Sequence, residues 1–141
     1  MKNTVKERLD WFHRFMPLYE RAAPLVRYIG DIESLKAGEL PASPSRLIES
    51  SILLRPVLHA VRRIPRSKEK ELVTIQREFE LALNSCIKAA EWAEKYLNCL
   101  NRGTGAQPQL AMLINSAVLA HEYIESVSAR VAPYLEPSNI S

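Results

Sequence analysis

The stretch SKEKELVTIQREFELALNSCIKAAEWAEKYLNCLN, residues 67–101, decides the fold class of this chain. Its apolar residues recur at alternating spacings of three and four, which places them along one side of a helix. These seam residues are Leu72, Ile75, Phe79, Ala82, Cys86, Ala89, Ala93, Tyr96 and Leu100. The pattern predicts one long helix over residues 67–101 with an apolar seam of four heptads.

The last third of the chain repeats this spacing. A glycine-containing turn at residues 101–105 ends the long helix. A second seam then begins at about residue 106 or 108, and it is formed by Leu110, Leu113, Ala117, Ala120, Ile124, Val127, Val131 and Tyr134. Because a proline disfavours helical backbone in the residue before it, Pro133 predicts that this helix ends at about Ala132.

The first half of the chain predicts two further helices that contain proline. Residues 4–29 begin with a capping box of Thr4 and Glu7 and end at a glycine. Their apolar stripe is Val5, Leu9, Phe12, Met16, Tyr19, Ala23 and Val26, widened by Trp11, Phe15 and Leu18. Pro17 and Pro24 lie inside this segment, so it is either one kinked helix or two helices that meet near Met16.

The other proline-containing helix begins at Ser43-Pro44, an N-cap followed by proline at the first helical position. It continues to about Ile64, and Pro56 in its middle predicts a bend. Its inner face is predicted as Leu47, Leu54, Leu58 and Val61, with Leu53, Val57 and Ile64 beside them. The sequence thus predicts an all-α protein with a single domain over residues 1–141. The domain is an antiparallel bundle of four long helices, the first two kinked at proline.

Composition agrees with a globular domain, with 47% hydrophobic and 25% charged residues. Cys86 and Cys99 lie thirteen residues apart in one predicted helix, about 20 Å along its axis, too far for a disulfide. We therefore expect reduced thiols in a cytoplasmic protein. The N-terminal residues lead into no apolar signal core, and no run approaches about 18 apolar residues, so we expect no membrane partner.

Few residues suggest catalysis or metal binding. A di-iron bundle needs Glu-x-x-His motifs, which do not occur in the sequence, and neither cysteine has a histidine neighbour. We therefore expect no catalytic residue, no metal and no cofactor. Arg8 and His13, separated by four residues, are similar to the basic pair that HEPN-type ribonucleases hold at a dimer cleft, although Leu9 replaces the polar residue that family favours. That resemblance implies an HEPN-like ribonuclease as a third functional hypothesis.

Charge is distributed unevenly along the chain, which has a net charge of +3. The stretch of residues 55–70 holds six Lys or Arg and a single Glu. Its predicted anion-binding residues are Arg55, His59, Arg62, Arg63 and Arg66. Four of them recur at helical spacing opposite the leucines, and arginine suits bidentate binding of phosphate or carboxylate. The alternative is a solvated outer face near a helix C-terminus, or one that pairs with acidic residues of the last two helices.

The functional expectation is therefore a non-catalytic helical interaction or assembly protein. Its expected partner is a protein. A second copy of the chain is one candidate, because the helix over residues 67–101 is longer than the helices expected to pack against it. The alternative is binding of nucleic acid or another anionic partner through the arginine-rich face. No Phe, Tyr or Trp lies in residues 55–70 for stacking on bases, and the sequence does not identify a partner.

Overall fold

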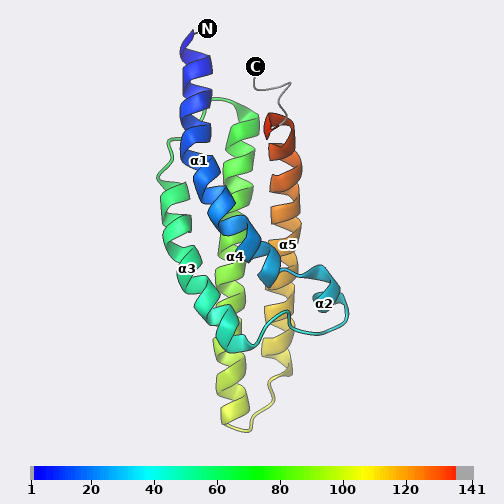
Figure 1. Ribbon diagram of the computed structural model, residues 1–141. Coiled ribbons are helices and arrows are strands. Elements are labelled where there is room, and N and C mark those ends of the chain that lie inside the picture. Colours follow the sequence, from blue (N-terminus) through cyan, green and yellow to red (C-terminus); the bar gives the residue numbers. More distant parts are fainter. Residues whose placement is uncertain (1, 136–141) are drawn as a thin grey trace.

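The computed structural model describes the backbone of residues 2–135 and the side chains of residues 5–135. It contains α1 (Lys2–Ile29), α2 (Ile32–Lys36), α3 (Pro44–Arg62), α4 (Lys70–Asn101) and α5 (Gln107–Leu135), and no strand occurs in this part of the chain. The four long helices run alternately up and down, and α1 crosses obliquely over the others (Figure 1). The predicted all-α antiparallel bundle of four long helices is confirmed.

Several helix ends differ from the predicted ones. α1 is a single helix with Pro17 and Pro24 inside it, and it begins at Lys2, before the predicted capping box. The side chain of Thr4, on which that box depends, lies outside the described residues. α5 continues through Pro133 to Leu135. The bends predicted at the prolines of α1 and α3 stay predictions.

The connectors account for two more differences. α4 begins at Lys70, three residues later than predicted. Before it, Ser67 accepts a hydrogen bond of 3.1 Å from the backbone N–H of Glu69, whose own backbone is extended. The short helix α2 was not predicted. It is capped by Asp31, whose side chain accepts from the backbone N–H of Glu33 at 3.3 Å.

The core lies where α4 packs against both α3 and α5. The α4 seam is fully buried from Leu72 to Ala93, and the α5 seam is buried from Leu113 to Val131. Leu100, at the far end of the α4 seam, is half exposed. In Figure 1 this end of α4 and the start of α5 extend beyond α1 and α3.

The predicted apolar stripe of α1 is wrong in its first two turns. Val5 is 60% and Leu9 54% exposed, whereas Trp11 and Phe15 are buried. The buried side of α1 is thus rotated toward the two aromatic residues, and Phe15 packs edge-on against Phe79 of α4. Among the helices within residues 2–135, none combines the length and apolarity needed to cross a bilayer.

Candidate docking groove between α1 and α3

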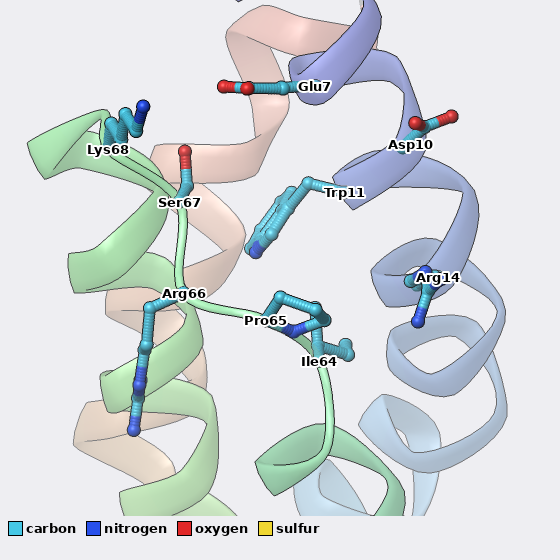
Figure 2. Close-up of a pocket in the computed structure, with 9 residues that line it drawn as sticks. All are labelled: Glu7, Asp10, Trp11, Arg14, Ile64, Pro65, Arg66, Ser67 and Lys68. Carbon is cyan, nitrogen blue, oxygen red and sulfur yellow. The ribbon is translucent and has the colours of Figure 1, made fainter.

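The predicted anion-binding residues are all exposed, but they do not form one site. Arg55, His59 and Arg63 line a shallow hollow on the outer face of α3. Arg66 lies beyond the end of α3 and lines a different pocket (Figure 2). Arg62 lies on another side of the helix and lines neither of these two regions. The arginine-rich face is therefore divided between two neighbouring regions.

Acidic residues of α4 engage two of these arginines. Arg66 donates from Nη2 to both carboxylate oxygens of Glu80, at 3.3 and 3.1 Å, and the Glu80 side chain is 13% exposed. Arg55 lies 3.8 Å from a carboxylate oxygen of Glu91, and both side chains are more than half exposed. Such an exposed pair contributes little. Arg62 and Arg63 have no ion pair or side-chain hydrogen bond within residues 5–135.

Three hollows join along the line where α1 crosses α3. Their volumes are about 330, 640 and 350 Å³. The first two share Ile52 and Pro56, and the second and third share Ala60 and Arg63. The first and third hollows are lined from both α1 and α3, whereas the second is lined by the outer face of α3 alone. Because neighbouring hollows share lining residues, the three adjoin one another along residues 52–63 of α3, and we call them together the α1/α3 groove.

The floor of the α1/α3 groove is apolar and unusually open to solvent. Ile52 is 61% exposed and Leu53 67% exposed, and both lie on the same turn of α3. From α1, Leu18 and Leu25 reach the groove half-buried. Leu53 was predicted beside the inner face of its helix, and that prediction is wrong. The buried face of α3 is narrower, so this leucine points away from α4.

The rim of the groove is basic on both sides. The basic residues that line it are Arg14, Arg21 and His13 from α1 and Arg55, Arg63 and His59 from α3. Among the described residues that line these three hollows, none is acidic and none is Phe, Tyr or Trp. Arg14 and Arg21 also lack an ion pair within residues 5–135. The α1 side was not predicted, because only the fold brings those residues next to residues 52–63.

A pocket of about 300 Å³ continues the groove past the end of α3. It shares Arg14 and Ile64 with the third hollow. Figure 2 shows Trp11 of α1 at its centre, facing the connector between α3 and α4, with Glu7 and Asp10 on α1 beside it. Since acidic and basic side chains both line this pocket, it lacks the charge bias of the groove.

Arg8 and His13, the pair that resembles the HEPN motif, contact different parts of the structure. The guanidinium of Arg8 donates to both carboxylate oxygens of Glu69, with the shortest bond 2.8 Å, and these contacts raise the pKa of Arg8. Arg8 thereby ties α1 to the residue at the N-cap position of α4. His13 instead lies in the α1/α3 groove, which Arg8 does not line.

Other reactive side chains are placed away from the groove. Cys86 is buried in the α4 seam, and burial raises the pKa of its thiol, so it is held as the neutral thiol. Cys99 is half-buried near the end of α4. Within the part of the chain that the structure describes, no three His, Cys, Asp or Glu side chains gather as a metal site.

Comparisons of the chain with protein-family models, with curated proteins and with solved structures found no match.

Proposed function

We propose that the protein is a non-catalytic interaction protein that holds an anionic partner protein in the α1/α3 groove. The observation that carries the proposal is the pair Ile52 and Leu53, which are exposed side by side within a rim of basic residues. Exposed apolar side chains in a depression with a polar rim are typical of protein interaction sites.

The charges on the rim support an anionic partner. Arg14, Arg21 and Arg63 have no acidic partner among the described residues. Their positive charges are therefore available to an anionic partner. Charges of one sign around a cleft attract a partner of the opposite sign and speed its association, and salt weakens this effect. An acidic protein surface therefore complements the rim while its apolar side chains cover the floor.

Nucleic acid is the second candidate, and the exposed, unpaired Arg62 and Arg63 favour it. The apolar floor has no role in contacting phosphates, and no Phe, Tyr or Trp lines the groove for stacking on the bases of a single strand. Retention on heparin and affinity for duplex DNA at rising salt test this candidate. A logarithmic slope near −0.9 for each phosphate contacted would support nucleic acid.

Site-specific photo-crosslinking in the native cell distinguishes the two candidates. A photoreactive amino acid replaces His59 in the groove and, as a matched control, the exposed Asn115 of α5. We expect an adduct specific to position 59 that protease digests and nuclease leaves intact. A nuclease-sensitive adduct would replace the proposal by the nucleic-acid function. Equal adducts at both positions would contradict both candidates.

A further inference from the structure

We propose that the occupant of the α1/α3 groove is an acidic amphipathic helix of about three turns, supplied by the partner protein. This inference rests on the proposed function and specifies the chemistry of its partner. Three features of the groove carry it: its length, the absence of an open backbone edge along its walls, and the position of its charges.

The length of the groove matches a short helix. The groove follows α3 from Ile52 to Arg63, and the eleven steps between these residues span about 17 Å at 1.5 Å per residue. A helix lying alongside α3 over this distance has three turns. Such a helix presents apolar residues at positions i, i+3 or i+4, and i+7, which is the usual pattern for a helix bound in a groove.

The walls of the groove favour a helix over an extended peptide. Both walls are α-helices, whose backbone groups bond within the helix, and residues 2–135 contain no strand to which a peptide strand can pair. An extended peptide over Ile52 and Leu53 would therefore lose hydration of its own backbone without gaining partners. A helix satisfies its backbone internally and exposes only its side chains to the apolar floor.

The charges flank the floor on both sides at helical spacing. Arg14 and Arg21 are seven residues apart on α1 and so span about two turns, and Arg63 lines the groove from α3. Arg55 lines it as well, but lies 3.8 Å from the Glu91 carboxylate of α4. A helix seated between them meets arginines along both edges. Acidic residues on both flanks of its apolar stripe complete the fit, whereas basic flanks would be repelled.

Display selection on the whole chain tests the inference without assuming a partner. A library of helix-forming 16-residue peptides is selected on the wild-type protein. We expect enriched peptides to carry leucine or isoleucine at i, i+3 or i+4, and i+7, with aspartate or glutamate on both flanks. The most enriched peptide is then fluorescently labelled, and its affinity is measured by anisotropy. A peptide of the same composition with its apolar stripe scrambled is the negative control.

Substitutions in the groove test whether the peptide binds there. Leu53→Glu and Arg63→Glu should each weaken binding about tenfold or more, because one removes floor contact and the other a flanking charge. Leu119→Glu and Arg102→Glu make the same changes at exposed positions elsewhere and should leave affinity within about twofold. Thermal unfolding checks that each variant is folded. Should Leu53→Glu fail to fold, Leu53→Ala tests the same contact.

The outcomes separate this inference from the proposed function. No enriched peptide, or peptides that bind Leu53→Glu as well as wild type, would overturn the acidic helix. A protein adduct at position 59 with no helical binder would leave the proposed function standing and remove only this inference. A dimer of the chain that Leu53→Glu dissociates would make a second copy the occupant and would also overturn it.

Discussion

The indole N–H of Trp11 donates a hydrogen bond of 3.0 Å to Oε1 of Gln76, joining α1 to α4 inside the core. The side-chain amide of Gln76 in turn donates to the carbonyls of Val61 and Ile64, at 2.9 and 3.1 Å, where α3 ends. Gln76 is fully buried. One side chain of α4 therefore binds to both α1 and the end of α3, the two walls of the groove.

Replacing Gln76 by leucine should destabilise the protein by about 2–4 kcal/mol, because the Trp11 N–H and the carbonyls of α3 lose their partner while buried. Trp11→Phe should cost about 1–3 kcal/mol. The double variant should cost less than the sum, since both changes remove the same hydrogen bond. Urea denaturation measures all three free energies of unfolding.

Arg77→Leu is the control for this network, because Arg77 is the exposed neighbour of Gln76 on the same helix. It should change the free energy of unfolding by no more than about 0.5 kcal/mol. Additive costs for Trp11→Phe and Gln76→Leu would show that the two side chains stabilise the fold independently.

Gly30→Ala should destabilise the protein by about 1–3 kcal/mol. Gly30 lies where the end of α1 meets α5, and a Cβ there would come within 2.9 Å of the backbone N of His121 and 3.1 Å of the Ala117 carbonyl. Backbone atoms cannot rotate away as a side chain does, so the two helices must separate. In Gly105→Ala the added Cβ meets no atom within 4 Å, and we expect a neutral or slightly stabilising change. Equal thermal unfolding of the two variants would contradict the close approach.

The free energy of unfolding should fall above pH 9 because the thiol of Cys86 is buried. Burial raises the pKa of its thiol above the ordinary value of 9.0, so the folded protein keeps a proton that the unfolded chain releases. The contribution is therefore complete below pH 9.0 and decreases above it, by up to about 1.4 kcal/mol per pH unit. Cys86→Ala should lower that slope in urea denaturation measured from about pH 8 to pH 10. An unchanged slope would argue against burial of the thiol.

The bundle could be predicted because the α4 and α5 seams keep one phase over many turns. Leu72 to Ala93 and Leu113 to Val131 are buried as their spacing predicts. The buried face of the first two turns of α1 could not be predicted, because two apolar stripes overlap there. Spacing alone does not tell whether Leu9 or Trp11 faces inward. Tertiary contacts decide this, through the hydrogen bond of Trp11 to Gln76 and the edge-on contact of Phe15 with Phe79, both of α4.

The groove was less predictable than the fold. The basic residues of α3 are visible in the sequence because they are close together in it. Arg14 and Arg21 join them only through the crossing of α1 over α3, which no local pattern encodes. A signal did exist in Ile52 and Leu53, which precede an arginine and a proline and extend the apolar face beyond the buried stripe of α3. An apolar face wider than its partner requires is typical of a binding surface.

Arg62 and Arg66 should respond differently to the same substitution. Arg66→Gln leaves the largely buried carboxylate of Glu80 without its partner and should cost about 1 kcal/mol, whereas Arg62→Gln should cost less than about 0.5 kcal/mol. The difference should shrink in about 1 M salt, where the screening length is about 3 Å. On an anionic matrix, Arg62→Gln should have the larger effect of the two substitutions. Both variants lose one positive charge, but the Arg66 charge is already balanced by Glu80, so Arg62→Gln should elute at lower salt. Equal stabilities together with equal elution would mean that the contact between Arg66 and Glu80 does not persist in solution.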